Sequence, residues 1–376
     1  MPAAAIPLLI VTAVLALATL LLALMVWCLR RATGRGRPGY WRRVLFVQLI
    51  LLPPFLVLGP PAALTCFAGF LVGTRSDERA YAGPRVDPEG HWSIQDRHLT
   101  LRRESGGEVV VDPTVLERAR SRAVRFESLD GVSLNGYLVP ALSQPARFQV
   151  VLVHGLFRNA METETAASIF HALGGDVLLL EMRNHGSSGR AAATFGRDES
   201  QDVRAAVDYL RSRAGGAERP LLLYGVSLGA GAVALAAPLV DDLSGLVLDA
   251  PMATLAKTAE NLMRDGIGLF QPYIFLIRFG VEWINDFDMD EVRPVESLGR
   301  LSADVPVLMI GATVDFRTPP EEVRAVYDAL RAPEGIKQLW IAEGARHGRV
   351  FEHDPDGYRT RLEALVERAL SGAGVK

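Results

Sequence analysis

Residues 221–249 read LLLYGVSLGAGAVALAAPLVDDLSGLVLD, and this stretch can be interpreted in two ways. Starting at Gly229 it gives G-x-G-x-x-A with Asp249 twenty residues further on, which is close to a dinucleotide-binding fingerprint. Starting at Gly225 it gives G-V-S-L-G, a strand-turn-helix pattern that exposes the hydroxyl of Ser227. The first interpretation predicts a cofactor site and the second a nucleophilic serine.

The position of the turn favours the serine. A dinucleotide fingerprint needs its first glycine in the tight turn directly after the strand, so that the pyrophosphate meets the helix N-terminus. Here the strand ends at Tyr224, so Gly225 occupies the turn and Gly229 falls inside the helix. A serine in such a turn needs small residues two positions before and after it, because strand and helix approach closely there. The helix N-terminus beneath Ser227 would also stabilise a developing oxyanion.

The remainder of residues 123–376 alternates between apolar runs and helical patterns. A hairpin is expected around Asp130-Gly131. Near-continuous Val and Leu runs are typical of strands buried on both faces, and hence of a parallel sheet with helices above and below. Strands are expected at 148–155, 176–183, 220–227, 244–251, 305–312 and 337–344, and helices at 162–173, 199–214, 228–239, 321–330 and 357–370. We therefore predict an α/β domain with a doubly wound, mostly parallel sheet.

A helical cap is expected within this domain, at residues 253–304, because no strand pattern occurs there. Its segment 267–284, IGLFQPYIFLIRFGVEWI, is apolar around most of its circumference rather than along one stripe. Such a segment is either buried or lines an apolar site.

Two later loops carry residues that could activate Ser227. VLMIGATVDFRTPP places Asp315 just after a strand, where a carboxylate can hold a histidine in the required tautomer. LWIAEGARHGRVF places His347 after the last strand. The order Ser227, Asp315, His347 is the serine, acid, histidine order of hydrolases with this strand-turn-helix serine.

Two rival assignments stay open. Asp249 ends the strand before that of Asp315 and could supply the acid instead. His353 with Asp354 also follows the last strand and is a rival base.

Together these features resemble the α/β-hydrolase superfamily over about residues 123–372, in its esterase, lipase and thioesterase branches. The resemblance extends to the loop 183–189, RNHGSSG, where many relatives read R-G-x-G-x-S and Asn184 here replaces the first glycine. It implies that His185 is structural.

The resemblance also implies an oxyanion hole. VVLVHGLF ends an early strand in His154-Gly155, where such enzymes take a second backbone donor. The expected donors are the N–H groups of Leu156 and Leu228, and His154 itself is expected to be structural.

The predicted activity is therefore that of a serine hydrolase. It would cleave a carboxylic ester or thioester, with an acyl chain or lipid as a plausible substrate, through an acyl-enzyme. Acyl transfer with the same three residues and a non-catalytic scaffold on the same fold are the alternatives. No cofactor or metal is expected, because no Walker A motif, H-E-x-x-H motif or paired cysteine ligand set occurs.

The N-terminal region 1–74 predicts a membrane hairpin. Residues 5–29 carry no charge and are long enough to span a bilayer. Residues 44–73 form a second uncharged run, which four prolines should kink, so that a re-entrant or interfacial segment is the alternative. Six arginines and no acidic residue lie between the runs, and the positive-inside rule places that loop in the cytoplasm. The bilayer is then a partner, and the large domain faces the outer side.

Residues 75–122 have no periodic pattern and are interpreted as a linker and lead-in. The net charge of -3 gives no indication of a nucleic-acid partner.

Overall fold

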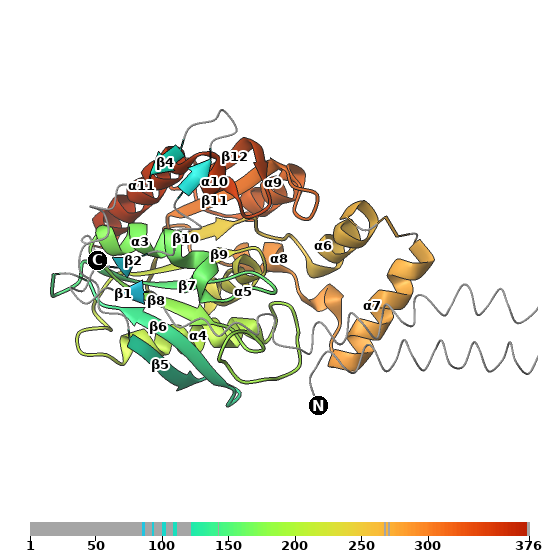
Figure 1. Ribbon diagram of the computed structural model, residues 1–376, viewed down its shortest axis with the longest axis horizontal. Coiled ribbons are helices and arrows are strands. Elements are labelled where there is room, and N and C mark those ends of the chain that lie inside the picture. The colour runs from blue at the N-terminus through green and yellow to red at the C-terminus, as the bar shows by residue number, and fades with distance from the viewer. Residues whose placement is uncertain are drawn as a thin grey trace, which may run out of the picture. The chain divides into compact units, whose positions relative to one another are not determined.

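The computed structural model describes residues 122–141, 143–266, 268–269 and 271–373, together with four short strands between residues 85 and 110 (Figure 1). The segments 5–29 and 44–73, expected to enter the membrane, lie outside the described residues. Within the described ranges, no helix combines the length and the apolar character that crossing a bilayer requires.

An eight-stranded sheet forms the centre of the domain, in the order β12-β11-β10-β9-β7-β8-β6-β5. The antiparallel pairs are β5 with β6 and β6 with β8, and all other neighbours are parallel. The fold is thus an α/β fold with a mostly parallel sheet, as the sequence predicts. The strands are β5 (Arg122–Glu127), β6 (Ser133–Val139), β7 (Phe148–Val153), β8 (Gly175–Glu181), β9 (Leu221–Val226), β10 (Leu243–Asp249), β11 (Val307–Val314) and β12 (Lys337–Arg346).

Helices cover both faces of this sheet. One face packs against α3 (Glu164–Ala172), which follows the short helix η2 (Ala160–Thr163), and against α11 (Pro355–Ala373), which follows α10 (Val350–His353). The other face packs against α4 (Glu199–Arg211), α5 (Leu228–Ala236) and α9 (Pro320–Ala329). Because these strands are parallel, their carboxyl ends lie at one edge of the sheet, where ligands of open α/β sheets bind.

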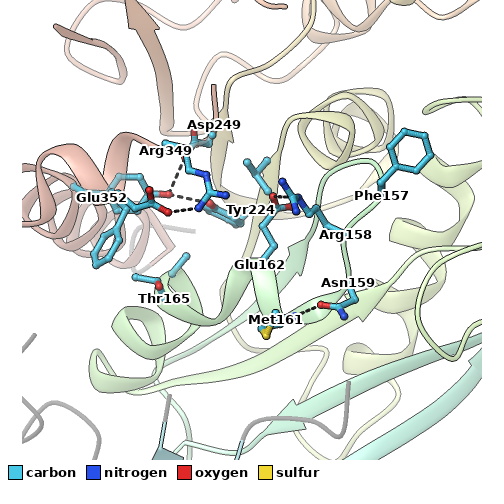
Figure 2. A pocket seen from close by; sticks show the side chains of 15 residues that line it. Phe157, Arg158, Asn159, Met161, Glu162, Thr165, Tyr224, Asp249, Arg349 and Glu352 are labelled. Carbon is cyan, nitrogen blue, oxygen red and sulfur yellow. Dashed lines mark hydrogen bonds and ion pairs between the residues drawn. The ribbon is translucent and has the colours of Figure 1, made fainter. Parts of the chain in front are cut away.

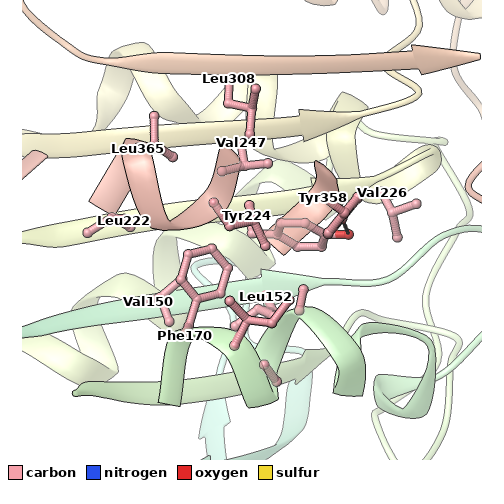
Figure 3. Packing of buried hydrophobic residues seen from close by; sticks show 14 of the residues in the cluster. Val150, Leu152, Phe170, Leu222, Tyr224, Val226, Val247, Leu308, Tyr358 and Leu365 are labelled. Carbon is pink, nitrogen blue, oxygen red and sulfur yellow. Dashed lines mark hydrogen bonds between the residues drawn. The ribbon is translucent and has the colours of Figure 1, made fainter. Parts of the chain in front are cut away.

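A hydrophobic core lies between the sheet and the pair α3 and α11 (Figure 3). Phe170 of α3 and Leu365 of α11 meet apolar strand residues such as Val247 there. Tyr224 and Tyr358 belong to the same cluster, and their hydroxyl oxygens lie 2.9 Å apart. This core therefore contains two buried hydroxyl groups that contact one another.

A buried arginine after β8 joins this strand to the β5–β6 turn and to α4. The guanidinium of Arg183, just after β8, donates to carboxylate oxygens of Asp202 in α4 and of Asp130 in the β5–β6 turn, each at 2.7 Å. It also donates to Ser128 Oγ at 3.0 Å. The Arg183 side chain is only 1% exposed, so these bonds compensate for the desolvation of a full charge.

In the segment 253–304, the described residues form helical elements and no strand: α6 (Leu255–Asn261), a π-helical turn η4 (Leu262–Gly266), α7 (Gln271–Asn285), η5 (Met289–Glu291) and α8 (Pro294–Leu298). α7 belongs to a second unit of the chain. It carries buried apolar side chains at Ile274, Ile277 and Val281. It carries exposed aromatic side chains at Phe275, Phe279 and Trp283. Apolar side chains thus occur on more than one face of α7, in agreement with the sequence pattern.

Two short antiparallel pairs occur in the segment interpreted as a linker. β1 (Arg85–Val86) pairs with β2 (Trp92–Ser93), and β3 (Thr100–Arg102) pairs with β4 (Glu108–Val110). Strands of two or three residues are too short to produce a recognisable alternation, which is why the sequence gives no signal for them.

Candidate active site

Ser227 sits in the turn between β9 and α5 with φ 55° and ψ −118°, a backbone conformation that non-glycine residues rarely adopt. Its N–H donates to the carbonyl oxygen of Asp249 at 2.8 Å, which helps to hold the turn. A Cβ on Gly225 would overlap the backbone of Gly229, and one on Gly229 would overlap the carbonyl oxygen of Val153. Both glycines are therefore required by space, as the serine interpretation predicts.

The same contacts argue against the dinucleotide interpretation. Gly229 lies within the first turn of α5 and faces the carbonyl oxygens of Val153 and His154, so no phosphate could approach its backbone. Within the described ranges, no group of three or more His, Cys, Asp and Glu side chains is arranged to hold a metal ion.

The structure brings Ser227, His347 and Asp315 into one hydrogen-bonded chain. His347 Nε2 lies 2.7 Å from Ser227 Oγ, and His347 Nδ1 lies 2.7 Å from Asp315 Oδ2. An ionised Asp315 can only accept, so Nδ1 carries the proton and Nε2 is left to accept from the serine hydroxyl. This is the arrangement that a serine nucleophile requires.

Asp315 is held by more bonds than the one to the histidine. Its Oδ1 accepts from the N–H groups of Arg317 at 2.9 Å and Thr318 at 3.1 Å. Its Oδ2 also accepts from the Thr318 hydroxyl at 2.8 Å. Burial acts to raise the pKa of the Asp315 carboxyl, but the bonds from His347 and Thr318 outweigh it and hold the pKa below its ordinary value. The carboxylate is therefore ionised and fixed in direction.

The rival residues lie elsewhere. Asp249 Oδ2 accepts from the Tyr358 hydroxyl at 3.1 Å, on the face of the sheet covered by α11. His353 ends α10, where its ring lies beside Gly344. Asp354 Oδ1 accepts from the N–H of Gly357 at the start of α11. Neither the Asp249 nor the Asp354 carboxylate is bonded to the imidazole that contacts Ser227.

Two buried histidines hold the loop that follows β7. His154 accepts from a backbone N–H with Nε2, so its Nδ1–H donates to the carbonyl oxygen of Gly155 at 2.8 Å. His185 Nε2 accepts from the N–H of Phe157 at 3.3 Å. Burial lowers the pKa of His154 to about 3 and also lowers that of His185, so both rings are neutral and can accept with one nitrogen. Both act as supports for the loop rather than as bases.

Glu162 is a third support of this loop, and no motif in the sequence indicates this role. Its Oε2 accepts from the N–H of Gly155 at 2.6 Å. A Cβ built on Gly155 would lie 3.2 Å from Ser227 Cβ, so this loop rests directly against the nucleophile. None of the bonds that hold the loop uses the N–H of Leu156, and Leu228 is the first residue of α5. Both expected oxyanion donors thus flank the nucleophile.

Thr318 is a second residue that motif reasoning missed. A weak signal existed, because a Thr three residues after an Asp often forms a local turn in which the Asp side chain accepts from the following backbone. In the loop 315–318 that turn fixes the acid.

Sequence comparisons find similar proteins. Residues 144–279 match a family described as serine aminopeptidase, S33. An uncharacterized protein of Bacillus subtilis, YqkD, is 24% identical over 276 residues, which covers 72% of this chain and 87% of that protein. An uncharacterized protein of Salmonella typhi, YfhR, is 25% identical over 267 residues, with 67% of this chain and 84% of that protein covered.

Solved structures are similar in fold. An esterase of Pyrococcus furiosus has a TM-score of 0.56 and 21% identity, with 66% of this chain and 91% of that chain covered. Est1E of Butyrivibrio proteoclasticus, solved with bound ferulic acid, has a TM-score of 0.53 and 19% identity, with 66% of this chain and 100% of that chain covered. The chain therefore has an α/β-hydrolase fold, and the matches support a hydrolase.

Proposed function

We propose that this protein is a serine hydrolase that cleaves a carboxylic ester or thioester through a covalent acyl-enzyme. Ser227 Oγ attacks the substrate carbonyl while His347 Nε2 takes the hydroxyl proton. Asp315 stabilises the imidazolium that forms and keeps its proton on Nδ1. The imidazolium then gives a proton to the leaving alcohol or thiol.

The observation that carries this proposal is the continuous chain of hydrogen bonds from Ser227 Oγ through His347 to Asp315, both links at 2.7 Å. A merely structural serine has no need of the unfavourable backbone at φ 55°, nor of an imidazole aimed at its hydroxyl. In the second half of the reaction, His347 takes a proton from water, which attacks the acyl-enzyme and releases the acid and free Ser227.

The tetrahedral intermediates need hydrogen-bond donors for the oxyanion, and we assign this role to the N–H groups of Leu156 and Leu228. Two observations support this assignment. The loop that contains Leu156 lies against Ser227, and Leu228 is the first residue of α5. Two backbone donors and a helix N-terminus stabilise negative charge without reorganisation during the reaction.

We further propose that the enzyme is attached to a membrane, with its catalytic domain on the outer side, and acts on an acyl chain or lipid. The uncharged runs 5–29 and 44–73 and the arginines between them support the attachment and its orientation. The apolar sequence of residues 267–284 supports an apolar substrate. A tethered site meets membrane-dissolved substrate at high local concentration.

Labelling with a fluorophosphonate tests the activated serine. The detergent-solubilised full chain should carry the adduct on Ser227, as identified by mass spectrometry of the peptide. Ser227→Ala should abolish labelling and lower kcat by about 10⁴-fold or more, whereas Ser302→Ala, the same change at an exposed serine, should change neither. Absence of an adduct on the folded protein would favour the scaffold alternative.

Product and substrate assays refine the proposal. Release of the free acid supports hydrolysis, whereas transfer of the acyl group to an added alcohol in preference to water would favour the acyltransferase alternative. Faster cleavage of long-chain than of short-chain esters would support the acyl-chain substrate. A reporter fused to the C-terminus that is active only in the cytosol would contradict the outward orientation.

A further inference from the structure

A pocket of about 140 Å³, shown in Figure 2, is lined by Val226 and Gly348, which are next in sequence to Ser227 and His347. Its walls come from the loop after β7 with η2, and from Gly348 and α10 behind the histidine loop. Ends of β9 and β10 and a tyrosine of α11 also line it. The side chains of Ser227, His347 and Asp315 do not line this pocket, so the reaction proposed above leaves it without a role.

Asp249 is the most unusual residue of the pocket. It is only 3% exposed, and it lines the pocket together with Tyr224 and Tyr358. Tyr358 donates its hydroxyl proton to Asp249 Oδ2 at 3.1 Å, and Tyr224 then donates to Tyr358 at 2.9 Å. Asp249 Oδ1 has no hydrogen-bond partner within the part of the chain that the structure describes. A buried carboxylate oxygen without a donor is costly, so a donor from outside the chain would be stabilising.

The charges around the pocket leave Asp249 without its own cation. Arg158 Nε lies 3.4 Å from Glu162 Oε1, and Arg349 forms an ion pair with Glu352 at the rim. Glu162 adds a second negative charge to the wall. Burial, and to a smaller extent the charge of Glu162, raises the pKa of Asp249 to about 7. A cation in the pocket would favour the ionised form of Asp249 and offset the negative charge of Glu162.

The walls also suit the apolar part of such a cation. Phe351 and Tyr358 line the pocket with ring centroids 5.7 Å apart, and Met161, Ala166 and Val226 add apolar surface. Aromatic faces next to a carboxylate are the surroundings in which proteins bind organic ammonium groups. The volume limits the ligand to a small molecule.

We propose that this pocket binds a small organic cation, whose primary ammonium group donates to Asp249 Oδ1 and whose alkyl part packs against Tyr358 and Phe351. The site is separate from the nucleophile and goes beyond the proposed function. It is nevertheless connected to the nucleophile, because the carbonyl oxygen of Asp249 accepts from the N–H of Ser227.

A ligand-observed NMR titration of the detergent-solubilised full chain tests the site with two probes of nearly equal size, n-butylammonium and n-butanol. We expect n-butylammonium to bind and n-butanol to bind at least about tenfold more weakly, because only the cation interacts with a carboxylate by charge. Asp249→Asn should weaken the binding of n-butylammonium by about tenfold or more. Asp208→Asn, the same change at an exposed residue of α4, should leave this affinity unchanged.

Affinity for n-butylammonium should also rise from about pH 6 to about pH 8, as Asp249 ionises among its facing groups Tyr224, Tyr358, Glu162 and Asp315. Equal binding of both probes, affinity that increases as the pH falls, unchanged affinity in Asp249→Asn or no binding of n-butylammonium would each overturn the proposal. The comparison of the two probes holds even if the variant does not fold. Fluorophosphonate labelling of Ser227 is independent of all these outcomes.

Discussion

Asp249 and Asp315 lie at the ends of neighbouring parallel strands, β10 and β11, yet their surroundings are opposite. Both are buried, at 3% and 4% exposure. The carboxylate of Asp315 accepts four hydrogen bonds, including that from His347, whereas the carboxylate of Asp249 accepts one, from Tyr358. The pKa of Asp315 is held below its ordinary value and that of Asp249 is raised by burial to about 7.

Burial raises the pKa of both carboxyls, but only Asp315 has enough donors to outweigh it, and the charges of Glu162 and Asp315 raise the pKa of Asp249 further. A carboxylate surrounded by N–H and O–H groups stays ionised inside a protein, and one without them keeps its proton at higher pH. Asp315 can therefore stabilise an imidazolium throughout the neutral range. Asp249 is suited to respond to its surroundings, such as pH or a bound cation.

The largest expected effect separates the two carboxylates in catalysis. Asp315→Asn keeps the shape but lets His347 adopt the wrong tautomer, so kcat for ester hydrolysis should fall by about 10⁴-fold. Asp249→Asn should change kcat by less than about tenfold, because no reacting group contacts that side chain. Steady-state kinetics of both variants measure kcat. An equal loss of kcat in Asp249→Asn would show that Asp249 is a catalytic acid.

The next effect concerns stability against pH. The pKa of Asp249 is about 7 in the folded protein against an ordinary 3.8, so the folded state keeps a proton that the unfolded chain has released. The stability that this proton contributes to the folded state is fully present below about pH 4 and is lost as the pH rises to about 7. Above that pH, the titration of Asp249 no longer changes the free energy of unfolding.

Asp249→Asn cannot titrate and therefore serves as the reference. Between about pH 4 and pH 8, the free energy of unfolding of the wild type should fall relative to the variant by about 4 kcal/mol. Chemical denaturation followed by tryptophan fluorescence measures the difference. A constant difference over this range would mean that Asp249 is ionised in the folded protein like Asp315.

A smaller effect should follow when Asp249 loses its one donor. Tyr358→Phe removes the hydroxyl that donates to Asp249 Oδ2, so the pKa of Asp249 should rise further and the stability loss should extend to higher pH. The free energy of unfolding should also fall by about 1–3 kcal/mol. Repeating Tyr358→Phe in the Asp249→Asn background is the control, because there the shift of the pH range must vanish.

The smallest effect tests the support of Asp315. Thr318→Val removes the hydroxyl bond to Asp315 Oδ2 at nearly constant shape, while His347 and two backbone N–H groups remain. We expect kcat to fall by about three- to tenfold with KM unchanged, equivalent to about 1 kcal/mol. Unchanged kcat would show that the backbone donors alone suffice to hold the acid.

The sequence could predict the sheet and the order of the three site residues, because buried parallel strands and a strand-turn-helix serine leave strong patterns. It left Asp249 open beside Asp315, since both residues end strands and a sequence pattern does not reveal which face each side chain takes. Only the packing of α11 brings Tyr358 to Asp249. The role of Glu162 could not be predicted either, because its contact with Gly155 depends on where η2 lies in the fold.

The loop 183–189 shows how a departure from a family pattern can be harmless. Asn184 replaces the glycine found in many relatives, and the structure places it at φ 66°. Asparagine tolerates this left-handed region better than most residues, so the loop can keep its path. His185 then remains in place to accept from the N–H of Phe157.

The buried guanidinium of Arg183 sets a limit on where the domain can be cut for expression or crystallisation. A fragment that begins after residue 131 would lack both Ser128 and Asp130 and would leave Arg183 with Asp202 alone among its charged partners. Such a fragment would keep Ser227, His347 and Asp315 but would be expected to aggregate, because a desolvated charge that has lost one of its two carboxylates strongly destabilises the fold. The smallest soluble catalytic fragment should therefore include the whole hairpin of β5 and β6.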